Sequence, residues 1–159
     1  MSKIRLGVLG GGGDSLIGVL HRVASYMYDR YEIVGGVFNP DYEENIKFAK
    51  QIGVNTDRVY KDFDAFVAEE SAKPEGEKVE VVSVLTPNFL HYPMAKKLLE
   101  NGFHVICEKP LTTTLEEAKE LQALQKKHQA IFAVTYTYTG YPMVREMKDM
   151  IANGVIGDI

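Results

Sequence analysis

Apolar residues along this chain fall into two alternating patterns. Residues 4–10 form a nearly continuous apolar run that ends in glycine, which is typical of a buried strand. Apolar side chains then recur at helical spacing between Ile17 and Tyr28, which predicts a helix. Further strands are predicted at residues 31–38, 57–60, 79–85, 103–108 and 130–137. Further helices are predicted at residues 41–53, 62–72, 88–102, 112–128 and 141–154.

Strands that alternate with helices over this length predict an α/β fold. The expected architecture is a doubly wound parallel sheet with helices on both faces, the three-layer Rossmann arrangement. Such sheets bind ligands at the carboxyl ends of their strands. We expect residues 1–153 to form one domain. The chain ends on an apolar residue, Ile159, where the pattern starts another strand, so we expect a longer protein to continue past it.

Composition and charge narrow the class of protein. The 159 residues are 45% hydrophobic, which suits one globular domain with a core. The net charge of -4 argues against a nucleic-acid partner, which would favour a basic surface. A single cysteine, Cys107, excludes an intrachain disulfide, and no Cys/His cluster has metal-site spacing. Without a signal peptide or an apolar run of about 18 residues, we expect a cytoplasmic protein that has no membrane partner.

Four glycines, Gly10 to Gly13, directly follow the first strand and precede a helix. Glycines there let backbone N–H groups approach phosphate oxygens, and the positive end of the helix favours an anion. The usual G-x-G-x-x-G spacing is not met, because Ser15 occupies the place of the third glycine. Either the glycines form only a mobile turn, or the loop is lengthened and Gly18 takes the third role. Asp14 or Ser15 would then cap the helix.

The second predicted strand is followed by Asn39, where NAD-binding Rossmann domains usually place an acid that hydrogen-bonds the adenosine ribose. An amide can bond the ribose 2′-hydroxyl, but it does not repel a 2′-phosphate as a carboxylate would. No Arg or Lys follows to attract that phosphate, so the position leaves NAD and NADP both open. Asn39 and Pro40 can equally be turn residues that lead into the next helix.

The strand at residues 79–85 is followed by a polar turn. Thr86, Pro87 and Asn88 form this turn, and His91 falls in the first turn of the next helix. Asn88 at a helix start is explained by capping alone, so this stretch by itself needs no ligand.

Glu108 and Lys109 are adjacent charges at the end of an apolar strand, and Pro110 follows them. Burying charge there is costly unless the pair finds partners. Lys109 would lie where a nicotinamide and a substrate meet, and its ammonium can donate a hydrogen bond to a substrate oxygen. The alternative is a surface ion pair at the start of a loop. Cys107 is most simply a small residue that ends the strand.

Taken in order, these motifs resemble the Gfo/Idh/MocA oxidoreductases, the relatives of glucose–fructose oxidoreductase and inositol 2-dehydrogenase. The resemblance rests on G-x-x-H at residues 18–21, TPNFLH at 86–91 and EKPL at 108–111. It covers essentially the whole chain, and residues 154–159 are similar to the start of the family's crossover into a second domain. The family joins an N-terminal Rossmann domain to a C-terminal domain with a large, mostly antiparallel sheet.

The resemblance implies an NAD(P)-dependent dehydrogenase that acts on sugars, inositols or related polyols. It implies Lys109 as the catalytic lysine, in contact with the cofactor as well. For the nicotinamide half of the cofactor it implies Thr86, Pro87, Asn88, His91 and Glu108. For the pyrophosphate it implies Gly10, Gly12, Gly13, Ser15, Leu16 and Ile17, with Gly18 as the third glycine. It also implies a homo-oligomer in the full-length protein, because relatives often associate through the second domain.

The sequence departs from the family pattern at three places. The lengthened loop puts the Asp14 carboxylate near the phosphates, where it has to point away. Asn39 replaces the common acid. Tyr138-Thr139 stands where many relatives have Tyr-Arg, which affects the substrate contacts expected there.

The family's Asp and His partners for the lysine come from the second domain. We therefore expect this chain to bind dinucleotide without turning over substrate. Two other classes stay open: a non-catalytic dinucleotide sensor and a methyltransferase that binds S-adenosylmethionine with the glycine loop. Retention of Lys109 argues against the sensor, and Asn39 in place of an acid argues against the methyltransferase.

Overall fold

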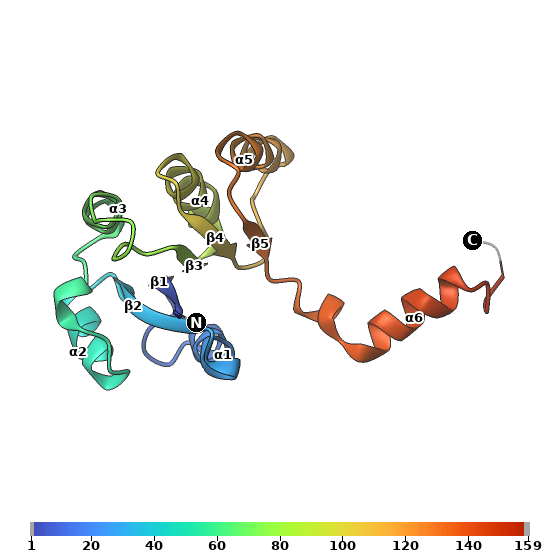
Figure 1. The fold of residues 1–159 in the computed structure, drawn as a ribbon, viewed down its shortest axis with the longest axis horizontal. Helices are drawn as coiled ribbons and strands as arrows, with labels where there is room; N and C mark the ends of the chain where they lie inside the picture. Colours follow the sequence, from blue (N-terminus) through green and yellow to red (C-terminus); the bar gives the residue numbers. More distant parts are fainter. Residues whose placement is uncertain (1, 158–159) are drawn as a thin grey trace.

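A computed structural model describes residues 2–157 and contains one sheet of five parallel strands (Figure 1). The strands lie in the order β2-β1-β3-β4-β5, and every neighbouring pair is parallel. Their bounds are β1 (Ile4–Gly10), β2 (Tyr31–Val37), β3 (Val81–Leu85), β4 (His104–Cys107) and β5 (Phe132–Val134). This topology confirms the predicted doubly wound α/β fold, and the order reverses beside β1 and β3, where such sheets bind ligands.

Helices cover both faces of the sheet, which gives the predicted three layers. One face carries α3 (Phe63–Ser71), α4 (His91–Glu100) and α5 (Leu115–His128), and Figure 1 shows α1 (Leu16–Tyr26) and α2 (Tyr42–Gln51) on the other. The last helix is α6 (Pro142–Ala152). Most bounds agree with the sequence pattern to within a few residues. The helix predicted from Asn88 instead begins with a 3-10 turn, Asn88–Leu90, and the Asn88 side chain caps no helix.

The strand predicted at residues 57–60 is wrong. Residues Thr56–Arg58 form a 3-10 turn, because the Asn55 side chain accepts a hydrogen bond from the Asp57 N–H at 3.0 Å and turns the backbone. Only Val59 pairs with the sheet, as an isolated parallel bridge to Gly36, and the Tyr60 N–H donates to the Gly36 carbonyl at 3.1 Å. The segment therefore runs beside the outer edge of β2 without becoming a sixth strand.

The core has two parts, one on each face of the sheet. Along β1, Leu6 and Val8 pack with Phe48 of α2, whereas Leu9 points to the opposite face. There it joins the larger cluster, in which the strands pack against α3, α4 and α5 around Phe66. Burial on both faces explains why β1 and β2 read as apolar runs rather than as alternating patterns.

The half of the sheet formed by β3, β4 and β5 is covered by helices on one face only. On the α1 side, Ser83 and Ile106 line an open cleft, and Ala133 of the edge strand is exposed. Helix α6 does not cover this face, because it extends away from the sheet (Figure 1). Its apolar residues Met143 and Met147 are 76% and 54% exposed. The carboxyl-end cleft on this side is therefore open to solvent.

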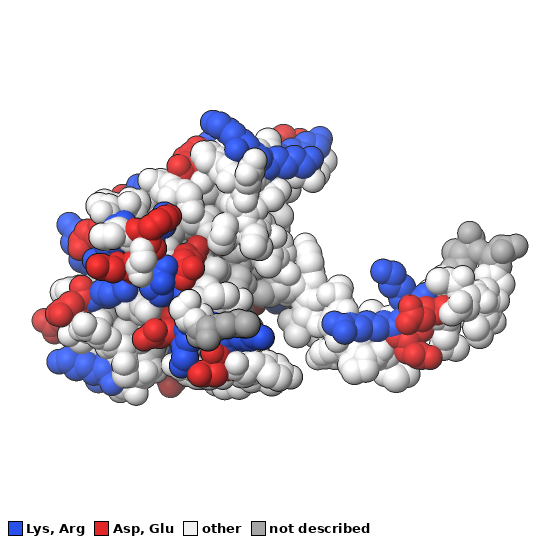
Figure 2. Space-filling view, viewed as in Figure 1, with Lys and Arg blue, Asp and Glu red and all other residues white. Residues whose placement is uncertain are grey.

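Charged side chains of both signs are mixed over the visible surface (Figure 2). No large field of a single sign gathers there, in keeping with the net charge of -4. Within residues 2–157, no helix is both long enough and apolar enough to cross a bilayer. Of the crossover expected at residues 154–159, positions 158 and 159 lie outside the described residues.

Candidate functional site

The glycine loop after β1 is packed so tightly against α1 that glycine is required at both ends. A Cβ atom on Gly18 would lie 1.8 Å from the Gly11 carbonyl oxygen. Gly11 and Gly13 have φ angles of +70° and +56°, in the left-handed region that favours glycine. Gly18 thus has the close helix packing expected of the third glycine, and the loop is an ordered turn rather than a loose one.

The amino end of α1 carries N–H groups that the helix itself does not satisfy. Ser15 is the N-cap, as one of the two predicted candidates, and its hydroxyl accepts a hydrogen bond from the Gly18 N–H at 3.1 Å. The preceding N–H groups of the helix, those of Leu16 and Ile17, have no carbonyl partner in the first turn. They and the helix dipole form a place for an anion at the end of the loop. Asp14 is exposed beside it.

Arg22 anchors the loop from the side of the helix. One guanidinium N–H of Arg22 donates to the Gly11 carbonyl at 2.8 Å, and the group lies 4.9 Å from the centre of the Phe48 ring. Burial lowers the pKa of Arg22 despite the nearby Tyr26. The Arg22 guanidinium thus stabilises the conformation of the glycine loop through the Gly11 carbonyl.

Two clefts open at the carboxyl edge of the sheet, and the first lies against the glycine loop. This glycine-loop cleft has a volume of about 560 Å³. Gly10, Gly11 and Gly12 line it on one side. The ends of β2 and β3 contribute the rest, including Asn39, Pro40, Thr86 and Pro87. The cleft joins the loop to the predicted ribose position.

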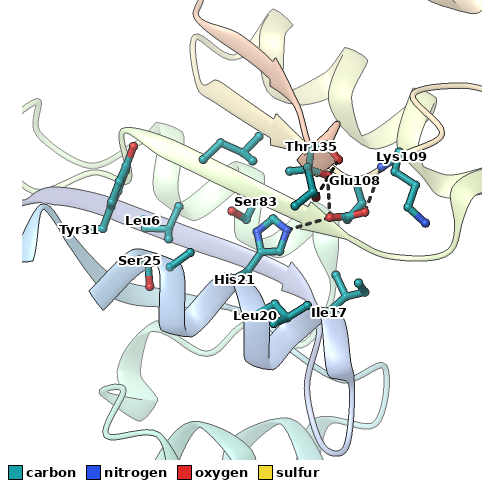
Figure 3. Close-up of a pocket in the computed structure, with 13 residues that line it drawn as sticks. Leu6, Ile17, Leu20, His21, Ser25, Tyr31, Ser83, Glu108, Lys109 and Thr135 are labelled. Atoms are coloured by element: carbon teal, nitrogen blue, oxygen red, sulfur yellow. Dashed lines mark hydrogen bonds and ion pairs between the residues drawn. The ribbon is translucent and has the colours of Figure 1, made fainter. Parts of the chain in front are cut away.

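The second cleft, the Glu108 cleft, lies between α1 and the open face of the sheet and has a volume of about 430 Å³ (Figure 3). Its floor is apolar and includes Leu6 and Ile106. Five of its polar residues gather near the carboxyl end of β4: His21, Glu108, Lys109, Thr135 and Thr137. Ile17, in the first turn of α1, lines the same cleft, so the amino end of α1 lies beside it.

Glu108 joins three elements at this point (Figure 3). One carboxylate oxygen lies 2.9 Å from His21 Nε2 of α1 and accepts a hydrogen bond from the Thr135 hydroxyl, beyond β5, at 2.6 Å. The other accepts from the Lys109 backbone N–H at 3.1 Å. Burial raises the pKa of Glu108, but the hydrogen bonds from Thr135, His21 and Lys109 outweigh it, so the pKa is lowered. The partners that a buried charge requires are therefore present.

Lys109 presents a charge at the mouth of the Glu108 cleft. Its side chain is exposed and runs away from the Glu108 carboxylate (Figure 3). Within residues 2–157, no ion pair holds its ammonium, so the predicted alternative of a Glu108–Lys109 surface ion pair does not form. The ammonium is available to a group that enters from solvent.

His91 ties together the turns that follow β3 and β4. The ring is 1% exposed, with Nδ1 at 2.7 Å from the Pro110 carbonyl oxygen and Nε2 at 2.9 Å from that of Thr86. Both ring nitrogens are engaged with backbone, so His91 offers almost no surface to a ligand. It positions the Thr86 turn relative to the segment that carries Lys109.

Cys107 ends β4 directly before Glu108 but carries no reactive thiolate. The residue is fully buried. Burial, with a smaller contribution from the Glu108 charge, raises the pKa of its thiol to about 12. Within the described part of the chain, no group of three or more His, Cys, Asp or Glu side chains could hold a metal ion.

The structure brings most of the residues singled out from sequence to the two clefts. Asn39, Thr86 and Pro87 line the glycine-loop cleft, whereas Glu108 and Lys109 line the other. Some residues lie elsewhere: His91 is buried, and Asn88 is exposed in the turn before α4. The contacts proposed between these residues and a cofactor stay predictions.

Sequence analysis missed three residues at the clefts: His21 and Thr135 as partners of Glu108, and Lys61 in the cleft that Asn39 lines. His21 stands in the G-x-x-H motif, which was a signal that it faces the site. Lys61 and Thr135 are distant in sequence from the residues that they approach, and nothing in the local pattern marks them.

The parallel sheet, the glycine loop and the clefts at its carboxyl edge define a Rossmann domain. The Gfo/Idh/MocA family model, described as "Oxidoreductase family, NAD-binding Rossmann fold", matches residues 4–136. The chain therefore belongs to this family of NAD-binding oxidoreductases. This assignment decides against the methyltransferase that the glycine loop alone had left open.

Individual relatives support the assignment. The chain is 40% identical over 157 residues to the uncharacterized oxidoreductase YfiI of Bacillus subtilis. The aligned region covers 98% of this chain and 39% of YfiI. It is also 40% identical over 81 residues to levoglucosan dehydrogenase of Pseudarthrobacter phenanthrenivorans, covering 51% of this chain and 21% of that enzyme. A crystal structure of an inositol dehydrogenase homolog from Azotobacter vinelandii, complexed with NAD+, matches with a TM-score of 0.92 and 37% identity. The matched region covers 99% of this chain and 40% of the Azotobacter chain. The chain thus spans about two fifths of the length of YfiI and of the Azotobacter protein.

The residues present fit a dinucleotide. A Cβ atom on Gly12 would lie 2.5 Å from the Phe38 carbonyl oxygen, so the loop backbone forms the wall of the glycine-loop cleft without side chains. The N–H groups at the start of α1 are of the kind that binds a diphosphate. Asn39 lies at the end of β2, where a ribose is bound in Rossmann domains.

Proposed function

We propose that this chain is the cofactor-binding domain of an NAD(P)-dependent dehydrogenase that acts on a CH–OH group of a sugar or polyol. The observation that carries the proposal is the exposed Lys109 ammonium at the mouth of a cleft beside the amino end of α1. Two relatives point to the substrate class, because one is named a levoglucosan dehydrogenase and the other an inositol dehydrogenase homolog.

In this proposal each end of the site has its own task. The glycine loop and the N–H groups of Leu16 and Ile17 bind the diphosphate, and Asn39 bonds the adenosine ribose. Thr86 and Pro87 line the wall of the same cleft. A bound nicotinamide supplies or accepts the hydride.

Lys109 is the proposed catalytic residue. Its ammonium donates a hydrogen bond to the substrate oxygen and stabilises negative charge that develops there as the C–H bond is broken or formed. Glu108 is a positioning residue, because its carboxylate accepts from the Lys109 N–H and is itself fixed by His21 and Thr135. His91 positions the same segment through the Pro110 carbonyl.

The test is a Lys109→Ala variant in a protein that joins this chain to a substrate domain, because we propose that the chain alone binds nucleotide without turnover. Absorbance at 340 nm over a panel of sugars and polyols gives kcat, and NADH fluorescence gives the cofactor Kd. Loss of a proton-transfer or hydrogen-bonding group predicts a fall in kcat of about 100-fold or more. The NADH Kd should change by less than about threefold, since the lysine contributes mainly at the substrate oxygen.

Lys127→Ala is the matched control, since Lys127 is an exposed lysine in the last turn of α5, away from both clefts. It should leave both constants unchanged. Unchanged turnover in Lys109→Ala would remove that residue from the mechanism. Tight NADH binding with no turnover of any substrate in the panel would favour the non-catalytic dinucleotide sensor.

A further inference from the structure

A cation lies at the ribose end of the glycine-loop cleft, where the sequence showed none. Lys61 lines this cleft together with Asn39, Pro40 and Asp62. The two segments meet because the chain after the 3-10 turn runs beside β2, with Val59 bridged to Gly36. Phe38 and Lys61 each follow this bridge by two residues, and both line the cleft together with Asn39. Tertiary structure thus brings Lys61 to the cleft that Asn39 lines.

The carboxylates near this end of the cleft are engaged as helix caps. Asp41 accepts a hydrogen bond from the Glu44 N–H at 3.0 Å and caps α2. Asp62 accepts from the Ala65 N–H at 2.8 Å and caps α3. The other Asp62 oxygen lies 3.9 Å from Lys61 Nζ, at the outer limit of an ion pair, and the Lys61 side chain is 73% exposed. Lys61 therefore keeps most of its capacity to bind another anion.

Asn39 has donors to offer at the same place. Its side-chain oxygen accepts from the Asp41 N–H at 2.9 Å, which fixes the amide and leaves the NH₂ group for a ligand. An amide donor suits both a ribose 2′-hydroxyl and a 2′-phosphate, whereas a carboxylate would repel the phosphate. The ribose end of the cleft thus combines a neutral donor with an ammonium.

We propose that Lys61 binds the 2′-phosphate of NADP(H), so that this site accepts NADP(H) as well as NAD(H). The assignment rests on the proposed dinucleotide site and names the residue that determines its cofactor tolerance. A lysine ammonium acts as a point charge toward phosphate, and a 2′-hydroxyl gives it no comparable partner. Substitution of Lys61 should therefore affect one nucleotide and spare the other.

The experiment measures the Kd of NADH and of NADPH for the chain itself, by nucleotide fluorescence at low and high salt. We expect the two Kd values to lie within about tenfold of each other. Lys61→Ala should raise the NADPH Kd by about fivefold and leave the NADH Kd unchanged, because an exposed charge contact contributes modestly. Added salt should weaken the binding of NADPH more than that of NADH, and this difference should be smaller in Lys61→Ala than in the wild type. Asn39→Asp should weaken NADPH by about tenfold or more through repulsion, without weakening NADH.

Lys127→Ala serves again as the control for loss of one exposed positive charge. The proposal is overturned if NADPH binds more than about tenfold more weakly than NADH, because the site would then disfavour the 2′-phosphate. It is also overturned if Lys61→Ala weakens both nucleotides equally or neither. If neither NADH nor NADPH binds to the unaltered chain, the dinucleotide site itself fails, and that outcome is distinct from the others.

Discussion

Glu108 directly follows β4, at the point where the chain leaves the buried sheet at its carboxyl edge. It follows a fully buried cysteine and precedes an exposed lysine, and its carboxylate receives hydrogen bonds from Thr135 and the Lys109 N–H and lies against His21. These contacts come from three different elements. They keep the carboxylate ionised in a half-buried place and fix the backbone from which Lys109 extends.

The lowered pKa of Glu108 gives the folded protein a dependence on pH. Its ordinary value is 4.5, so the ionised carboxylate stabilises the folded state above about pH 4.5. That contribution is lost as the pH falls through the lower pKa of the folded state. In urea unfolding, the free-energy difference between the wild type and Glu108→Gln should be greatest near neutral pH and shrink on acidification.

Variants of Thr135 separate the hydrogen bond from packing. Thr135→Ser keeps the hydroxyl and should preserve the pH-dependent difference. Thr135→Val keeps the shape but should reduce that difference, because loss of the hydrogen bond from the hydroxyl raises the pKa of Glu108. If both variants behave alike, the hydroxyl does not hold the carboxylate as described.

The sequence could predict residues whose role depends on local geometry, but not those whose role depends on distant partners. Ser15 as a cap and Gly18 as the third glycine follow from their places at the start of α1. The shared cleft of Lys61 and Asn39 and the hydrogen bond of Thr135 to Glu108 arise only when separate segments meet at one edge of the sheet. A single sequence contains no local pattern for such pairs.

At the scale of elements, the helices were predicted better than the shortest strands. Helix α5 has a capping box in which Thr114 accepts from the Glu117 N–H at 3.2 Å and the Glu117 carboxylate accepts from the Thr114 N–H at 3.1 Å. Such caps depend on residues three positions apart and can be recognised in sequence. The predicted strand at 57–60 had an apolar pattern of only a few residues, and a side-chain cap from Asn55 was enough to turn it.

The capping box gives a prediction for α5. Thr114→Ala should lower the free energy of unfolding by about 1 kcal/mol, because it leaves an N–H at the helix start without its acceptor. Thr114→Ser should cost much less, since the hydroxyl remains and serine caps helices at least as well as threonine. Both values are measured by urea unfolding near neutral pH. Equal losses in the two variants would show that the threonine methyl, rather than the cap, stabilises the helix.

The whole molecule is a sheet that is complete at its binding edge and open on part of one face. Both clefts are formed by residues 2–157: the glycine loop lines one of them, and Ile17 in the first turn of α1 lines the other. The face of β3, β4 and β5 on the α1 side has no helix over it, and α6 extends away (Figure 1). This arrangement fits a chain that binds a dinucleotide by itself, while the substrate contacts that we propose require further residues.

The central claim is that the glycine loop and the start of α1 bind a dinucleotide, and calorimetric titration of the chain with NADH tests it directly. We expect saturable binding in the wild type and in Gly76→Ala, since a Cβ atom there has no neighbour within 4 Å. Gly18→Ala should lose binding, because its Cβ atom would lie 1.8 Å from the Gly11 carbonyl oxygen and displace the loop. Circular dichroism shows whether each variant is folded. Absence of saturable NADH binding to the wild type, or equal affinity in a folded Gly18→Ala variant, would contradict the account.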